Sequence, residues 1–480
     1  NDLVGPMGNR GERGLDSIGL ILANHQDREG SAAISSLIHS VAMKIFTNDL
    51  ADRSTSLMGP FLALLLASSA AAPVLTDTSF WALILISLFA LGRAKVSALS
   101  REDWRWICVL ALWPMTILAI EWIHGPLWSA LDRPIRLLAA LPLFFLIRWK
   151  GISSSWVGWG CLVGVMVGLA LHDTNPFISV DGISRAQAYS GNPISYGQFM
   201  LVLGVLGASA WALRDSKVQY QILGLVSLLA GLGGVMLSGT RGVWLAAIPL
   251  VAFTVMLWWS CASRWSSTRA RGFGVILVLT LWVAVMVAAF PSVMERASEF
   301  FSFFSHAGIS HPGGKSLLEQ SSLEHRMDLL MHGWVLYEQS PWIGVGAEAL
   351  REALARQAHL GALETGRVHL HNELIQMLAT YGLVGMASLV LFMAGFGWIC
   401  WRTFMDLASR QARIAPSMSL QLILSLALFS LSDSLLSNMN RVQIYAVLLA
   451  VCAGACRHAQ LHQERERRES QASHAGHCQA

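Results

Sequence analysis

Long apolar runs alternate with short polar segments along most of the 480-residue chain. A helix needs about 20 predominantly apolar residues to cross roughly 30 Å of hydrocarbon. Runs of about this length predict about twelve transmembrane helices, near 57–73, 77–92, 104–120, 134–149, 152–171, 193–213, 218–238, 241–259, 272–291, 372–400, 416–434 and 441–456. The pattern therefore predicts an all-α polytopic membrane protein, and the small residues of "ILGLVSLLAGLGGVMLSG" at 222–239 favour close helix packing.

The polar segments between these runs divide the chain into five parts. We expect a polar N-terminal segment at 1–55, nine transmembrane helices within 56–291, a large helical loop at 292–371, three more helices within 372–456 and a polar tail at 457–480.

Composition agrees with a membrane protein and argues against nucleic acid as a partner. Hydrophobic residues make up 54% of the chain and charged residues only 13%, with a mean hydropathy of +0.50. A soluble domain carries roughly 25% charged residues. The net charge of +4 is small. Because the basic residues fall in short loops between apolar runs, they indicate control of membrane topology rather than binding of nucleic acid.

The basic loops alternate along the chain and so predict its orientation. They follow the second, fourth, sixth, eighth and tenth predicted helices, and include Arg93, Lys95, Arg101, Arg105, Arg148, Lys150, Arg214, Lys217, Arg264, Arg269, Arg271, Arg402, Arg410 and Arg413. Loops rich in Lys and Arg remain in the cytoplasm. We therefore expect both termini in the cytoplasm and the loop 292–371 on the outer face.

Several basic residues fall on the predicted outer face despite this rule, namely Arg133, Arg136, Arg185, Arg241, Arg326, Arg367, His369 and His371. A charge near the hydrocarbon is costly unless it is paired, although a single Arg can extend its head group to the interface. Guanidinium groups bind phosphate through two parallel hydrogen bonds. The cluster therefore predicts a site for a lipid-linked phosphate or pyrophosphate. The outer loops contain no Asp-x-Asp pattern, so we expect neither a metal nor another cofactor.

Five polar side chains crowd the start of the tenth predicted helix, in "RVHLHNELIQMLATYGLVG" at 367–385. Imidazole has an ordinary pKa near 6.5 and accepts protons at neutral pH. His371 is therefore a candidate general base, with His369, Asn372, Glu373 and Arg136 as supporting residues. The alternative interpretation is a solvated helix start in which His371 only caps the helix.

Three segments resemble the O-antigen ligase and polymerase superfamily. His371-Asn372 is followed by nine residues and Gly382, which resembles the family's His-Asn signature, and we expect Gly382 to allow close helix packing. "LSGTRGVWLA" at 237–246 is similar to its Ser-x-Thr-Arg turn. "HRMDLLMHGWVLYEQSPWIGVG" at 325–346 is similar to its Arg…Trp…Pro-x-x-Gly-x-Gly pattern.

The resemblance implies a GT-C-like glycosyltransferase in the bacterial inner membrane, with its active site facing the periplasm. An O-antigen ligase transfers polysaccharide from undecaprenyl pyrophosphate to a sugar hydroxyl of lipid A–core. The family's catalytic His falls on His371, and its phosphate-binding arginines fall on Arg241 and Arg326. Arg185 is assigned to the same role by position alone. Direct attack by the acceptor would invert the anomeric centre, and we find no obvious carboxylate pair of the kind a retaining enzyme needs.

Other functions stay open on this pattern. An O-antigen polymerase and a protein O-oligosaccharyltransferase share the fold and differ in the acceptor, which no motif here identifies. A secondary transporter would place polar residues and broken helices near the middle of the membrane, often in two repeated halves. The ionisable residues here lie at the outer ends of the predicted helices, and no half-repeat is evident, so a transporter is disfavoured.

Overall fold

A computed structural model describes residues 50–70, 72–93, 98–125, 128–174, 177–178, 184–190, 192–214, 217–261, 322–359, 369–434 and 438–477. All of these residues except 50–54 belong to the compact unit Thr55–Ala480. The predictions for the polar segment before residue 50, for the helix at 272–291 and for the loop residues 292–321 lie outside the described residues.

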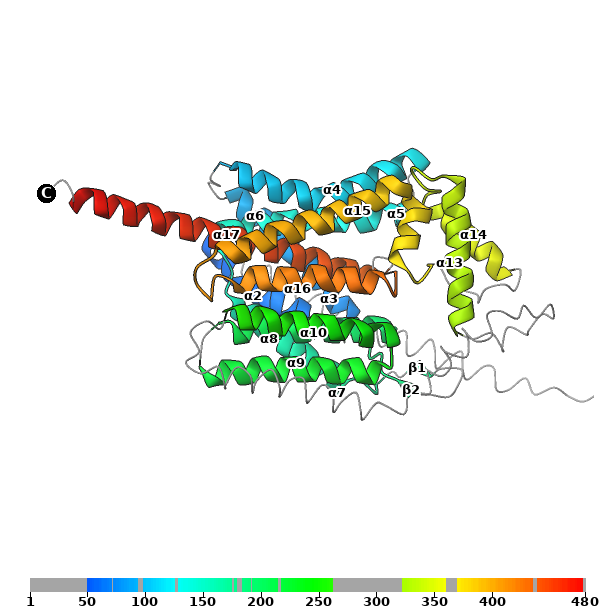
Figure 1. The fold of residues 1–480 in the computed structure, drawn as a ribbon, viewed down its shortest axis with the longest axis horizontal. Helices are drawn as coiled ribbons and strands as arrows, with labels where there is room; N and C mark the ends of the chain where they lie inside the picture. The colour runs from blue at the N-terminus through cyan, green and yellow to red at the C-terminus, as the bar shows by residue number, and fades with distance from the viewer. Residues whose placement is uncertain are drawn as a thin grey trace, which may run out of the picture. The chain divides into compact units, whose positions relative to one another are not determined.

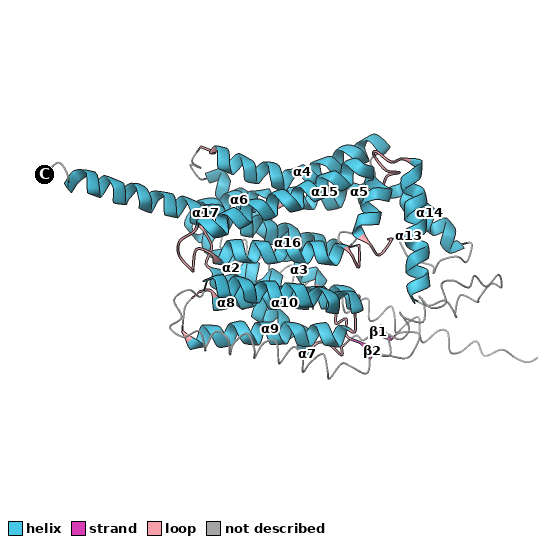
Figure 2. Ribbon diagram, viewed as in Figure 1, coloured by secondary structure: helices cyan, strands magenta, loops and turns pink. Residues whose placement is uncertain are grey.

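The described part of the chain is helical apart from one short strand pair (Figures 1 and 2). The helices are α2 Leu50–Ser68, α3 Pro73–Arg93, α4 Arg101–His124, α5 Trp128–Ala139, α6 Leu141–Lys150, α7 Ser154–Ala170, α8 Pro193–Ala212, α9 Val218–Ser238, α10 Arg241–Cys261, α13 Ser322–Gln339, α14 Ala347–His359, α15 Glu373–Asp406, α16 Ile414–Ser430 and α17 Met439–His477. Strands β1 Phe177–Ile178 and β2 Ser184–Arg185 pair antiparallel.

Seven of the described helices are long and apolar enough to cross a membrane: α3, α4, α8, α9, α10, α15 and α17. Three shorter apolar helices, Ser56–Ser68, Ser154–Ala170 and Ile414–Ser430, also coincide with predicted spans. The all-α membrane class is therefore confirmed, whereas the count of twelve spans is not established by the described residues.

The span predicted at 134–149 needs a correction. The structure divides it between α5 and α6, with Ala140 between them. Pro142 stands at this break, and proline has no backbone N–H to continue a helical ladder. With 10 residues, α6 is about 15 Å long and too short to cross the hydrocarbon alone.

Among the seven long apolar helices, α8 is the most deeply buried, and it packs closely against α9. Almost all of the apolar stretch of α8 is buried, 94% by residue count. A Cβ added to Gly231 would lie 2.6 Å from the carbonyl oxygen of Met200, so only glycine lets the two backbones approach this closely. The small residues of 222–239 thus allow the packing that the sequence predicts.

A break inside α15 connects two of the signature motifs. Gly382 has φ 62° and ψ −161°, which interrupts the helix. The freed backbone pairs with the segment 341–346: Leu383 N–H donates to Pro341 O at 2.8 Å, and Val345 N–H donates to Ala379 O at 2.9 Å. A Cβ on Gly382 would lie 2.4 Å from the Trp342 backbone. The glycine that we expected to allow helix packing therefore allows a loop to dock on α15.

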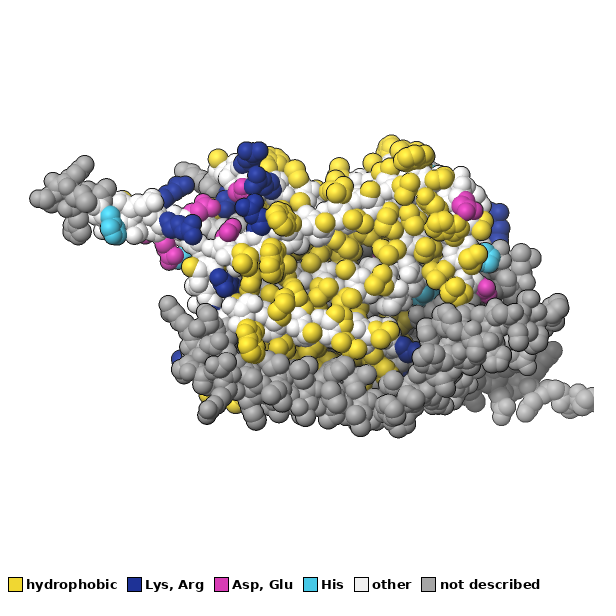
Figure 3. Space-filling view, viewed as in Figure 1, with side chains coloured by type: hydrophobic (Ala, Val, Ile, Leu, Met, Phe, Trp, Pro, Cys, Tyr) yellow, Lys and Arg dark blue, Asp and Glu magenta, His cyan; other side chains and the backbone are white. Residues whose placement is uncertain are grey.

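The bundle has two ends with different polar residues. The His371 end contains the starts of α8, α10, α15 and α17, and α13 packs there against α15 (Figure 1). The Asp103 end contains the start of α4 and the end of α15. Exposed tryptophans lie near each end, with Trp122 and Trp342 near the first and Trp398 and Trp401 near the second. Tryptophans concentrate at membrane–water interfaces, and an apolar surface lies between these ends in Figure 3.

Candidate active site

His371 lies in the tight turn that begins α15. Its φ of 52° is a left-handed conformation that non-glycine residues rarely adopt. Asn372 is the N-cap: its side chain accepts from Ile375 N–H at 3.0 Å and donates to Leu431 O at 3.0 Å. Asn372 therefore caps α15 and ties its start to the end of α16, which holds the His371 backbone against the loop after α16.

That loop places a carboxylate beside the His371 ring. Asp433 Oδ1 lies 3.4 Å from His371 Nδ1. The Asp433 side chain is 1% exposed and the His371 side chain 13% exposed. An imidazole that directs Nδ1–H to a carboxylate keeps Nε2 as a proton acceptor. The two atoms approach each other without forming a hydrogen bond. The negative charge beside Nδ1 nevertheless favours a proton on Nδ1, which suits a general base that acts through Nε2.

Arg441, at the start of α17, balances the charge of Asp433. The two side chains form an ion pair, and Arg441 Nη1 also donates to Gln198 Oε1 of α8 at 2.9 Å. The Arg441 side chain is 2% exposed. Burial raises the pKa of Asp433, but Arg441 and His371 together lower it further, so the net pKa lies below the ordinary range. Asp433 is therefore a negatively charged partner for the imidazole at neutral pH.

The other polar residues near His371 pack against its ring or lie in the first turns of α15. The His369 ring packs edge-on against the His371 ring, with centroids 4.3 Å apart. Glu373 is buried in the first turn of α15. Gln376 Oε1, one turn on, accepts from Leu370 N–H at 3.1 Å and from Ser434 Oγ at 2.8 Å. These contacts fix the backbone on both sides of His371.

One group of three side chains among the described residues could hold a metal ion. It comprises His369, His371 and Asp433, whose ligand atoms all lie within 4.8 Å of one another. Imidazole and carboxylate are ligands that zinc accepts. Arg441 already pairs with Asp433, and its positive charge opposes a cation at that carboxylate.

Two of the predicted phosphate-binding arginines lie at the same end of the bundle as His371 and Asp433. Ala186 N–H donates to Leu237 O at 3.0 Å, which holds the segment after β2 on the end of α9. A Cβ on Gly239 would lie 3.5 Å from Arg185 Cγ, so Arg185 rests on the turn that leads to Arg241. Arg241 is the exposed first residue of α10.

The next residue connects the Arg241 turn to the His371 site. A Cβ on Gly242 would fall 2.6 Å from Ser432 Cβ, and Ser432 precedes Asp433 in the chain. The turn carrying Arg241 therefore packs on the loop carrying Asp433. The structure thus brings Arg185, Arg241 and His371 to one end of the bundle.

The remaining predicted residues are placed differently. Arg136 donates to Asp77 at 2.7 Å and to Asp132 at 3.0 Å, and its guanidinium stacks over Phe80 and Trp81. Two carboxylates therefore already balance its charge. Arg326 belongs to α13, but the structure does not describe its side chain. Arg367 lies outside the described residues. The predictions for both side chains therefore stay predictions.

A cavity of about 240 Å³ lies beside the first turns of α15. Its lining includes Glu373, Gln376 and Tyr381 of α15, together with Arg133 of α5 and Arg351 of α14. Arg133 Nε is buried and has no hydrogen-bond partner among the described residues. Glu348 also lines the cavity and pairs with Arg351 at 2.7 Å. The cavity thus presents the Arg133 guanidinium, the Glu373 carboxylate and this ion pair to a polar molecule at the His371 end.

Sequence reasoning missed Asp433 and Arg441. Asp433 stands in the sequence as an isolated acid, because its partners lie on other segments. Arg441 stands at the first position of a predicted span, where a charge resembles an ordinary interfacial residue. The signal that could have found Arg441 is the one that singles out Arg241, namely that a charge at the outer edge of an apolar run needs a partner.

Comparison with known proteins agrees with the motifs. No curated protein matches the chain. Residues 226–390 match the family model described as O-antigen ligase. The matched segment contains Arg241, Arg326 and His371, whereas Asp433 and Arg441 lie beyond it. Residues 226–390 thus carry an O-antigen ligase domain, and the chain's resemblance to that superfamily is confirmed.

Proposed function

We propose that this protein is an O-antigen ligase. It transfers polysaccharide from undecaprenyl pyrophosphate to a sugar hydroxyl of lipid A–core, at the periplasmic face of the bacterial inner membrane. The O-antigen ligase domain and the membrane-spanning helices support the class of enzyme. The donor, the acceptor and the orientation are part of the proposal.

The observation that carries the proposal is the meeting of a histidine with a carboxylate partner and of arginine residues at one end of the bundle. His371 lies beside the Asp433 carboxylate at 3.4 Å, and the loop carrying Asp433 is the one on which the Arg241 turn packs. A glycosyl transfer from a lipid pyrophosphate needs both functions, because the acceptor must lose a proton while the leaving group gains negative charge.

In the proposed reaction, the acceptor hydroxyl oxygen attacks C1 of the donor sugar. His371 Nε2 takes the hydroxyl proton, and Asp433 stabilises the imidazolium that forms. The bond between C1 and the pyrophosphate oxygen breaks, and its electron pair leaves with undecaprenyl pyrophosphate. Arg241 and Arg185, joined by Arg326, neutralise the leaving group. Attack from the opposite side inverts the anomeric centre.

Both substrates are lipids, which is consistent with the position of the site. Their reacting groups lie near the membrane surface, and the start of α15 is at the same end of the bundle as the exposed Trp122 and Trp342, a residue type that concentrates at that surface. The cavity lined by Arg133 and Glu373 begins two residues after His371 in the chain and is our candidate for the acceptor sugar.

The test is transfer in vitro by the purified chain, with polysaccharide-linked undecaprenyl pyrophosphate and lipid A–core. We expect the lipid A–core to gain polysaccharide, and the product to have the anomeric configuration opposite to that of the donor. Elongation of the donor without lipid A–core would instead indicate a polymerase, and transfer to a protein acceptor would indicate an O-oligosaccharyltransferase.

The same assay tests the absence of a metal requirement. We expect full transfer in EDTA, because guanidinium groups supply the positive charge. If transfer requires an added divalent cation, the group of His369, His371 and Asp433 becomes a metal site and the general-base assignment fails.

A further inference from the structure

The Asp103 end contains a polar cavity that has no part in the proposed transfer reaction. Its volume is about 650 Å³, and its walls come from α4, α15 and α17. It lies at the opposite end of α15 from Glu373, and a 34-residue helix is about 50 Å long. The cavity is therefore too far from His371 to bind the reacting groups.

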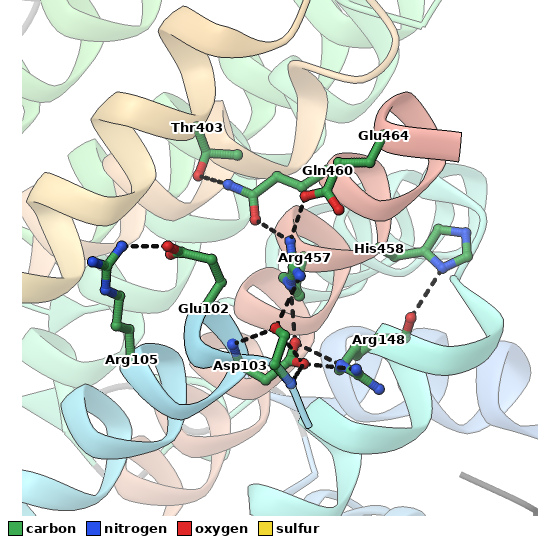
Figure 4. A network of polar contacts seen from close by, with 10 residues as sticks. Glu102, Asp103, Arg105, Arg148, Thr403, Arg457, His458, Gln460 and Glu464 are labelled. Atoms are coloured by element: carbon green, nitrogen blue, oxygen red, sulfur yellow. Dashed lines mark hydrogen bonds and ion pairs between the residues drawn. The ribbon is translucent and has the colours of Figure 1, made fainter. Parts of the chain in front are cut away.

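The inner side of this cavity is a closed network of ion pairs (Figure 4). Asp103 is fully buried and pairs with Arg148 at 2.6 Å and with Arg457 at 2.9 Å. Arg457 also pairs with Glu464 at 3.1 Å, and Arg105 pairs with Glu102. These charged groups already have partners. The network therefore holds α4, α6 and α17 together, and its groups are not available to bind a ligand.

Two arginines on the outer side of the cavity have no such partner. Arg402 of α15 and Arg467 of α17 line the cavity, are exposed, and have no ion pair or hydrogen bond with the described residues. The lining as a whole contains four arginines and three carboxylates, so its net charge is +1. A monovalent anion would balance it.

The surroundings indicate that this anion belongs to a lipid. Trp398 lines the cavity beside Arg402 and is 63% exposed, and Trp401 next to it is 40% exposed. In Figure 3, Lys and Arg side chains gather at this end, next to the apolar surface of the bundle. Large exposed indoles beside basic residues at a helix end are typical of the membrane interface. Basic pockets between helices on the cytoplasmic side bind the head groups of anionic lipids.

We propose that this cavity binds an anionic phospholipid of the leaflet at the Asp103 end. The phosphodiester accepts hydrogen bonds from Arg402 and Arg467, and the acyl chains lie against Trp398 and the neighbouring apolar surface. A single phosphodiester charge neutralises the lining. The bound lipid would hold the end of α15 against α17 at the point where α17 continues beyond the bundle (Figure 1).

The test is native mass spectrometry of the delipidated full chain, titrated with dioleoyl-phosphatidylglycerol. Each arginine near an anionic lipid contributes roughly a factor of five in affinity, so we expect Arg402→Ala/Arg467→Ala to weaken binding by about 25-fold. The matched control is Arg465→Ala/Arg468→Ala, which removes the same charge from exposed positions of α17 outside the cavity lining. The control should keep wild-type affinity.

Three results would overturn the proposal. Equal losses in both double variants would mean that the lipid is attracted only by general surface charge. Equal affinity for dioleoyl-phosphatidylcholine, which has no net charge, would remove the argument from charge balance. Competition by glycerol 3-phosphate at the affinity of the lipid would make this a site for a soluble phosphate. Failure of glycosyl transfer would leave the lipid-binding result unaffected, because the two sites are at opposite ends.

Discussion

Removing the carboxylate behind His371 gives the most informative prediction. In Asp433→Asn the side chain keeps its shape but loses its negative charge. One of its two carboxylate oxygens, which only accept hydrogen bonds, is replaced by an NH2 group, which donates them. His371 would then lose the negative charge 3.4 Å from Nδ1, to which we assign the choice of tautomer. General-base catalysis typically raises a rate about 10²-fold to 10⁴-fold. We expect Asp433→Asn to lower the transfer rate by a factor within this range.

The same substitution also affects stability, because Asp433 has a second partner. Arg441 is 2% exposed and would retain only Gln198 among its hydrogen-bond acceptors from the described residues. Breaking a buried ion pair by removing one partner costs about 3–5 kcal/mol. We therefore expect Asp433→Asn to lower the thermal denaturation midpoint of the purified protein in detergent.

A double variant separates these two effects. Asp433→Asn/Arg441→Gln removes both charges, so no uncompensated guanidinium stays buried. We expect its denaturation midpoint to recover most of the loss seen in Asp433→Asn, while its transfer rate stays low. If the transfer rate recovers together with stability, Asp433 serves only to neutralise Arg441, and its proposed role in positioning His371 is refuted.

The pH dependence follows from the pKa of Asp433. This pKa lies below its ordinary value of 3.8, so the ion pair contributes stability that is fully present above about pH 4. The contribution is lost as the pH falls through the lower pKa of the folded state. Between pH 5 and 8 the stability due to this carboxylate should be constant in the wild type. A decline of that stability within this interval would contradict the charged state of Asp433.

Six further variants at five positions test the site and its support. His371→Ala should lower transfer about 10²-fold to 10⁴-fold with the donor still bound, and His369→Ala should be far milder; the assignment of the base fails if only His369 proves essential. Arg241→Ala should abolish transfer without unfolding, and Arg241→Lys should rescue it poorly because the bidentate fork is lost; full transfer by Arg241→Ala would contradict the clamp. Gly382→Ala should lower the denaturation midpoint, because φ is 62° and the new Cβ would meet the Trp342 backbone at 2.4 Å, whereas Gly397→Ala in the same helix meets only ordinary contacts at 3.7 Å. Equal midpoints for the two glycine variants would contradict the docking of the 341–346 segment.

Features that depend on neighbouring residues could be predicted from the sequence. Runs of about 20 apolar residues identify membrane helices because the hydrocarbon thickness sets their length. The Ser-x-Thr-Arg turn and the His-Asn motif are contiguous, so the sequence alone is enough to name Arg241 and His371. The family comparison confirms the resemblance that these motifs indicate.

Contacts between distant segments were decided only by the tertiary structure. The partner of His371 is Asp433, which comes from the loop after the next helix, and the partner of Asp433 comes from the helix after that. Hydrophobic periodicity shows which segments are buried, but it does not show which polar side chains will meet. The same reason explains why Arg136 looked available for phosphate although two carboxylates bind it. Where charges are buried, pairing follows from the packing of helices, and a single sequence does not contain that packing in any local pattern.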